Sequence, residues 1–93
     1  MTDGGVVREN VKIVNKKGLH ARAAAAFVRE AERFDAEIRV ERDGKKVSGG
    51  SIMGLMMLGA AMGEEITITC SGKDAGKALA ALKRLIDEKF YED

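Results

Sequence analysis

The apolar residues of this 93-residue chain switch between two spacings along the sequence, and the switch predicts where strands and helices lie. Apolar and polar residues alternate over residues 7–13, 36–41 and 66–70, as in strands with one buried face. Over residues 22–33 and 75–90 the apolar residues recur every three to four positions, which predicts helices with one apolar stripe. The two stripes comprise Ala24, Phe27, Val28 and Ala31, and then Ala75, Leu79, Leu82, Ile86 and Phe90.

Short turn and cap signals complete the order of elements. Asp43-Gly44 predicts a two-residue hairpin turn that leads into a further strand over residues 45–48. Ser51 is the expected N-cap of a short apolar helix, and Gly59 is its expected end. The order is therefore strand, helix, strand, strand, short helix, strand, helix.

This order predicts an α+β fold, a two-layer open-faced β-sandwich. We expect a four-stranded antiparallel sheet covered on one face by the helices, the last of which Asp74 caps. The other face stays solvated. Residues 1–93 are expected to form a single domain, with residues 1–5 as a disordered tail. The polar side chains expected on the solvated face include Arg8, Lys12, Glu37 and Arg39.

Charge and cysteine content exclude several classes of protein. Sixteen basic and fifteen acidic residues give a net charge of +1, which argues against a nucleic-acid-binding module. Cys70, the single cysteine, excludes an internal disulfide and is expected to be a small buried hydrophobe. We expect no metal, no cofactor, no membrane span and no signal peptide, and hence a cytoplasmic protein. A nucleic-acid binder would have to rely on the scattered basic residues Arg8, Lys12, Lys16, Lys17 and Lys45.

The only histidine, His20, lies between the first predicted strand and the first predicted helix. The first N–H groups of a helix have no intrahelical partner and stabilise an anion. Gly18 permits a tight turn, and Arg22 adds a guanidinium group that suits phosphate oxygens. A neutral imidazole is itself a nucleophile that can carry a phosphoryl group. We therefore predict a phosphate site with His20 as acceptor and Ala21 and Arg22 as phosphate-binding residues; the alternative is an ordinary exposed or capping histidine.

Residues 51–58 contain more apolar side chains than one short helix can bury. Some of them are therefore expected to face solvent as a contact patch. The competing interpretation is that these side chains simply fill the core.

Two motifs resemble those of a known family. Residues 15–22, Asn-Lys-Lys-Gly-Leu-His-Ala-Arg, resemble the active-site motif of the HPr family, the histidine-containing phosphocarrier proteins of the bacterial phosphotransferase system. Residues 51–56, Ser-Ile-Met-Gly-Leu-Met, resemble the regulatory-serine motif of that family. The resemblance covers nearly the whole chain. It implies a phosphocarrier that is a co-substrate of phosphotransferases and is not itself an enzyme.

The resemblance also implies a role for each motif residue. His20 would accept a phosphoryl group on Nδ1 from enzyme I, which phosphoenolpyruvate charges, and pass it to a histidine of an enzyme IIA. Arg22 would steady the phosphate, and Ser51 would be the target of an HPr kinase/phosphorylase where one exists. The implied docking residues are Ile52, Met53 and Met56. We expect the protein to be a monomer.

Two departures leave the physiological role open. Ala23 stands where many members of the family have proline, and residues 34–37 and the acidic ending resemble the nitrogen-branch type, NPr. The Ser51 segment instead resembles HPr proteins regulated by serine phosphorylation. Sugar uptake and regulation of nitrogen or carbon metabolism thus both remain possible roles. The alternative function is a regulatory adaptor that docks its Ser51 face on partner proteins.

Overall fold

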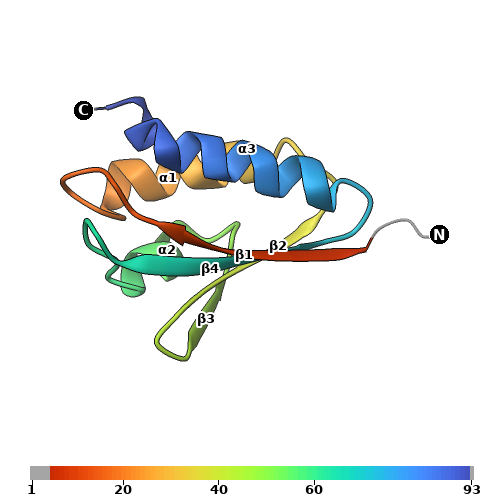
Figure 1. Ribbon diagram of the computed structural model, residues 1–93, viewed down its shortest axis with the longest axis horizontal. Coiled ribbons are helices and arrows are strands. Elements are labelled where there is room, and N and C mark those ends of the chain that lie inside the picture. The colour runs from red at the N-terminus through yellow and green to blue at the C-terminus, as the bar shows by residue number, and fades with distance from the viewer. Residues whose placement is uncertain (1–4, 93) are drawn as a thin grey trace.

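The computed structural model describes residues 5–92 and shows a sheet with two long helices lying side by side on one face (Figure 1). The predicted order of elements is confirmed. Of the predicted disordered tail, residues 1–4 lie outside the described residues. The elements are β1 (Val6–Lys12), α1 (Ala21–Ala31), β2 (Glu37–Arg42), β3 (Lys45–Ser48), α2 (Ile52–Met57), β4 (Glu65–Ser71), α3 (Ala75–Asp87) and the single 3-10 turn η1 (Lys89–Tyr91).

The four strands form one antiparallel sheet in the order β1-β4-β2-β3. β4 is therefore central, although it is the last strand in the sequence, and it pairs with β1 along its whole length from Val6 opposite Ser71 to Lys12 opposite Glu65. On its other side β4 pairs with β2, and Ile68 lies opposite Val40. The predicted α+β open-faced sandwich is confirmed, and the last strand, β4, lies between the first strand, β1, and β2.

The core lies between the inner face of the sheet and the stripes of α1 and α3. Both predicted stripes are buried, and Phe27, Ile68 and Leu82 are completely inaccessible to solvent. Burial raises the pKa of the Cys70 thiol to about 11, which leaves the thiol protonated and unreactive. Its predicted place as a small core residue is confirmed.

The opposite face of the sheet carries charged side chains in solvent, as predicted. Arg8 on β1 pairs with Glu41 on β2 at 4.0 Å, and Arg39 pairs with Glu37 at 2.5 Å. These exposed pairs contribute little to stability. They keep one face of the sheet polar, so the helices on the other face form the only covering layer among the described residues.

Asp74 occupies the N-cap position of α3, but the prediction that its side chain caps the helix is wrong. Within the described residues its carboxylate bonds no N–H group of α3. Instead Oδ2 accepts a bond from the backbone N–H of Asp35 at 2.9 Å, and the Asp74 N–H donates to the Asp35 carbonyl at 2.9 Å. The backbone of Asp74 (φ −105°, ψ 25°) is not in the extended conformation typical of an N-cap. Asp74 therefore joins the loop after α1 to the start of α3.

Arg42 at the end of β2 fixes the position of α2. Its Nη1 donates to the carbonyl of Leu58, the C-cap of α2, at 3.0 Å, and its Nη2 lies 2.9 Å from Glu64 before β4. α2 also contacts α1 and β3, and Leu55 and Leu58 are buried in the core. The short helix is thus held beside α1 by both polar and apolar contacts.

Candidate functional site

His20 is the N-cap residue of α1, close to the helix start predicted from the sequence. Its backbone is extended (φ −77°, ψ 179°), and its carbonyl accepts the first helical bond from Ala24 at 2.8 Å. Within the described residues its side chain makes no capping bond. The imidazole is 26% exposed, so the ring is available beside the positive end of the α1 dipole.

Gly18 brings the loop before His20 against the chain that follows α2. Its φ of +66° lies in the left-handed region, and a Cβ built on it would lie 2.3 Å from the Ala60 carbonyl oxygen and 3.0 Å from Ala61 Cα. The next residue, Leu19, is buried and donates its N–H to the same Ala60 carbonyl at 3.0 Å. Only glycine fits this approach, because both the backbone conformation and the space exclude a side chain.

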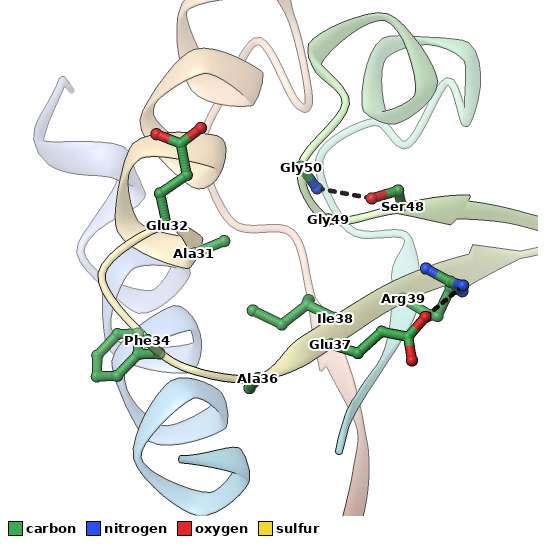
Figure 2. A pocket seen from close by; sticks show the side chains of 10 residues that line it. All are labelled: Ala31, Glu32, Phe34, Ala36, Glu37, Ile38, Arg39, Ser48, Gly49 and Gly50. Atoms are coloured by element: carbon green, nitrogen blue, oxygen red, sulfur yellow. Dashed lines mark hydrogen bonds and ion pairs between the residues drawn. The ribbon is translucent and has the colours of Figure 1, made fainter. Parts of the chain in front are cut away.

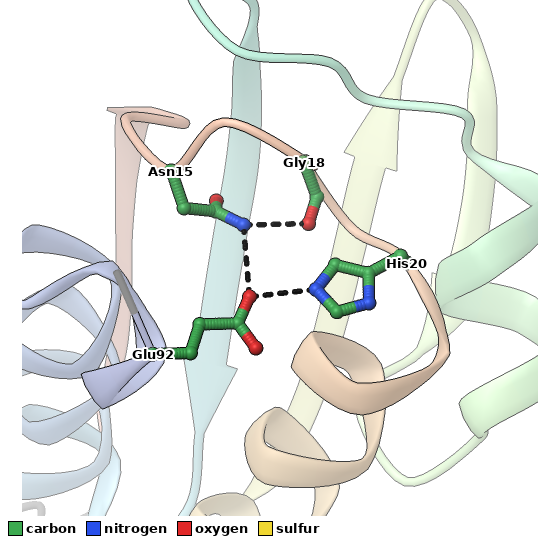
Figure 3. A network of polar contacts seen from close by, with 4 residues as sticks. All are labelled: Asn15, Gly18, His20 and Glu92. Carbon is green, nitrogen blue, oxygen red and sulfur yellow. Dashed lines mark hydrogen bonds and ion pairs between the residues drawn. The ribbon is translucent and has the colours of Figure 1, made fainter.

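A carboxylate from the far end of the sequence contacts the His20 ring (Figure 3). Oε1 of Glu92 lies 2.6 Å from Nε2 of His20, and the Glu92 side chain is only 12% exposed. Nδ2 of the buried Asn15 lies 3.4 Å from the same oxygen and donates to the Gly18 carbonyl at 2.9 Å. Figure 3 shows the second ring nitrogen of His20 on the side away from this carboxylate.

We did not predict from the sequence that Glu92 and the contacts of Asn15 belong to this site. Seventy-two positions separate Glu92 from His20, and no local pattern joins them. The available signals were that Asn15 belongs to the motif around His20 and that an acidic residue follows the last helix.

The turn Lys89–Tyr91 brings Glu92 to this place. Its three residues have φ values of +58°, +57° and +60°, the left-handed region that residues other than glycine rarely adopt. Each such residue costs about 1–2 kcal/mol. A run of three persists only where the surroundings determine it, and here Phe90, which is 5% exposed, anchors the turn in the core.

Arg22 and Ala21 are exposed on the first turn of α1, next to His20. Among residues 5–92 the Arg22 guanidinium makes no hydrogen bond or ion pair with another side chain. The structure thus brings the three predicted phosphate-site residues together at one helix start. Their roles toward phosphate stay predictions at this point.

Ser51 caps α2 as predicted, since its Oγ accepts a bond from the Gly54 N–H at 2.9 Å. In the apolar segment that follows, some side chains fill the core and others face solvent, so each of the two interpretations holds for part of it. Leu55 and Leu58 fill the core, whereas a group of neighbouring side chains is exposed. This exposed group, which we call the α2 patch, consists of Ile52, Met53, Met56 and Met57.

The hollow shown in Figure 2 lies at the other end of α1 from His20, and Gly49 and Gly50, directly before Ser51, form part of its lining. It holds about 240 Å³ between the C-terminal end of α1, at Ala31, and the strand residue Ile38. Because α1 has 11 residues, the hollow lies about 16 Å from the His20 end of the helix. In the part of the chain that the structure describes, no group of three histidine, cysteine or acidic residues is placed to hold a metal ion. No described helix has the length and apolarity needed to cross a membrane.

A family model described as "PTS HPr component phosphorylation site" matches residues 7–88, a range that includes both His20 and Ser51. The chain belongs to the HPr family. Among curated relatives, the HPr-like protein Crh of Bacillus subtilis (strain 168) is 44% identical over 84 residues, which are 90% of this chain and 99% of the relative. The phosphocarrier protein NPr of Shewanella violacea is 46% identical over 86 residues, which are 92% of this chain and 94% of the relative.

A solved structure confirms both the family and the fold. The crystal structure of HPr-C-His from Thermoanaerobacter tengcongensis is similar to this chain with a TM-score of 0.89 and 45% sequence identity. The similarity covers 94% of this chain and 98% of that one. The HPr fold therefore extends over nearly all of the described residues.

Proposed function

We propose that this HPr-family protein is a phosphocarrier that takes a phosphoryl group from enzyme I on His20 and passes it to an enzyme IIA. One observation carries the assignment to His20: its ring lies at the start of α1, with one nitrogen turned away from Glu92 and Arg22 two residues further on. The family supports the phosphocarrier activity, and the geometry supports the acceptor residue.

The chemistry uses the side chains and the backbone N–H groups at this helix start. The lone pair of the free ring nitrogen, Nδ1, attacks phosphorus as the bond to the donor breaks. The first N–H groups of α1, at Ala21 and Arg22, and the Arg22 guanidinium stabilise the phosphate oxygens. The protein is then a co-substrate of phosphotransferases. It is phosphorylated in the first half-reaction and regains its unphosphorylated form only in the second. We place it in the cytoplasm as a monomer.

Ser51 supplies a regulatory site on the neighbouring helix. A phosphate there would add about −1.5 to −2 charges at the N-cap of α2, beside the exposed Ile52, Met53 and Met56. We propose that partner proteins dock on these residues, and that this charge weakens docking of enzyme I by repulsion and desolvation. An HPr kinase/phosphorylase, where present, would be the enzyme that adds it.

The decisive experiment is incubation with enzyme I and labelled phosphoenolpyruvate. We expect label that is labile in acid and stable in base, because a nitrogen–phosphorus bond breaks readily once the nitrogen is protonated. His20→Ala is expected to take up none while keeping the circular dichroism spectrum of the folded protein. Acid-labile label that persists in His20→Ala would refute His20 as the acceptor.

The same assay separates the regulatory-adaptor alternative, which the similarity to Crh, described as the catabolite repression HPr of Bacillus subtilis, favours. An adaptor that works mainly through its Ser51 face would bind partners but would take no label on His20. The presence of both His20 and Arg22 at the helix start argues for the phosphocarrier. Transfer from the labelled protein to IIA proteins of the sugar and nitrogen branches then distinguishes the two physiological roles.

A further inference from the structure

The Glu92 carboxylate contacts one particular nitrogen of the His20 ring, and this contact is built into the fold. Oε1 lies 2.6 Å from Nε2, and the Nδ2 group of Asn15 approaches the same oxygen at 3.4 Å (Figure 3). The Asn15 side chain is completely buried, and its bond to the Gly18 carbonyl fixes the direction of its Nδ2 donor. A buried amide and the imidazole thus orient one carboxylate oxygen between them.

The backbone before Glu92 supports a positioned contact. Three successive left-handed residues, Lys89–Tyr91, lead into Glu92, and Phe90 holds the turn in the core. By contrast, Glu88 lies just before this turn, is exposed, and makes no side-chain bond within the described residues. The unusual turn therefore distinguishes one acidic residue of this segment from the other.

The chemistry of the two partners decides which ring nitrogen carries the proton. An ionised carboxylate only accepts hydrogen bonds, so Nε2 of His20 must donate. A neutral imidazole has a single N–H, and placing it on Nε2 leaves the lone pair on Nδ1. We propose that Glu92 is a positioning residue that holds neutral His20 in the Nε2–H tautomer and makes Nδ1 the nucleophilic atom, an inference that rests on the proposed function.

The same contact serves the transfer step. The Nδ1 lone pair forms the new nitrogen–phosphorus bond while the bond from phosphorus to the donor's phosphorylated nitrogen breaks, and that electron pair stays with the donor. The His20 ring keeps its Nε2 proton and becomes a cation, which the Glu92 carboxylate balances. When an acceptor attacks the phosphorus, the electron pair returns to Nδ1 and the ring regains the same neutral tautomer.

The test combines nuclear magnetic resonance with transfer kinetics on the full chain. The ring of unphosphorylated protein is labelled with nitrogen-15 and observed at a pH where the imidazole is neutral. We expect wild type to show mainly the Nε2–H tautomer and Glu92→Ala to show a mixture. Phosphorylation of Glu92→Ala by enzyme I is expected to be slower by roughly tenfold.

Two further variants separate the contact from the charge. Glu92→Gln keeps an oxygen that can accept from both Asn15 and His20, so we expect it to retain the Nε2–H tautomer. Glu88→Ala removes one negative charge from the same segment without touching the ring, and we expect it to match wild type in both measurements.

Each other outcome overturns part of the account. The role of Glu92 is overturned if Glu92→Ala keeps the wild-type tautomer, or if its tautomer changes while its transfer rate stays at the wild-type value. Either result leaves the proposed function of His20 intact. A wild-type protein that takes no phosphoryl group from enzyme I overturns the proposed function and this inference together.

Discussion

The His20 and Ser51 sites are both helix starts, yet they are built from contacts of different range. Ser51 bonds Gly54, three residues away, and so satisfies a first-turn N–H of α2 with its own side chain. Within residues 5–92 the His20 ring makes no capping bond, and it instead contacts Glu92, which lies 72 positions later in the sequence. A local cap satisfies a first-turn N–H group and stabilises the helix start. A start that is fixed instead by contacts distant in sequence leaves its N–H groups and a ring nitrogen available to bind a phosphoryl group.

Glycine substitutions test this contrast most strongly. We expect Gly18→Ala to destabilise the protein by about 3 kcal/mol or more, because it combines a left-handed backbone with a clash against Ala60. The matched control is Gly59→Ala at the end of α2, where φ is +64° but, among the described residues other than its chain neighbours, no atom lies within 4 Å of the new Cβ. It is expected to cost only about 1 kcal/mol. Urea denaturation checks both, and equal losses would show that the close approach at Gly18 contributes nothing.

The range of the contacts also explains which parts were predictable from the sequence. The Asp43-Gly44 turn and the Ser51 cap involve neighbouring residues, and both formed as the local pattern indicates, with φ values of +51° and +82° at the turn. Apolar periodicity likewise placed the helices and strands, because each element must turn one face to the core.

Tertiary contacts account for what the sequence did not reveal. Asp74 has the side chain of a good N-cap, but the N–H of Asp35 competes for its carboxylate across 39 positions. Glu92 reaches His20 only because α3 and the left-handed turn return the chain to that end of the molecule (Figure 1). Neither outcome follows from propensities of adjacent residues, since the competing partner comes from another element.

The next test removes the positive charge of Arg22 at the start of α1, and we expect an effect of intermediate size. We expect Arg22→Ala to slow phosphoryl transfer about tenfold in both directions without unfolding the domain, because an exposed charge-assisted phosphate contact is lost. Arg22→Lys is expected to recover only part of the rate, since lysine lacks the planar two-point contact. Rapid-quench kinetics with enzyme I and a IIA protein provide the measurement.

The control for Arg22 lies on the same helix. Arg29→Ala removes an exposed positive charge near the C-terminal end of α1, and we expect transfer at the wild-type rate. If the two variants slow transfer equally, net charge and not the phosphate contact at the helix start is responsible.

The smallest expected effect on stability is at Ser51, where cap and regulatory role can be separated. Ser51→Ala loses the bond to the Gly54 N–H and is expected to cost about 1 kcal/mol in urea denaturation. Ser51→Asp keeps an acceptor and places a negative charge at the positive end of α2, so its stability is expected to stay near wild type. We nevertheless expect slower labelling of His20 in this variant, because the charge lies beside Ile52 and Met53 of the α2 patch. One carboxylate imitates a phosphate only in part, so the protein phosphorylated on Ser51 gives the stronger test. Labelling of that protein at the wild-type rate would leave Ser51 with the role of a helix cap alone.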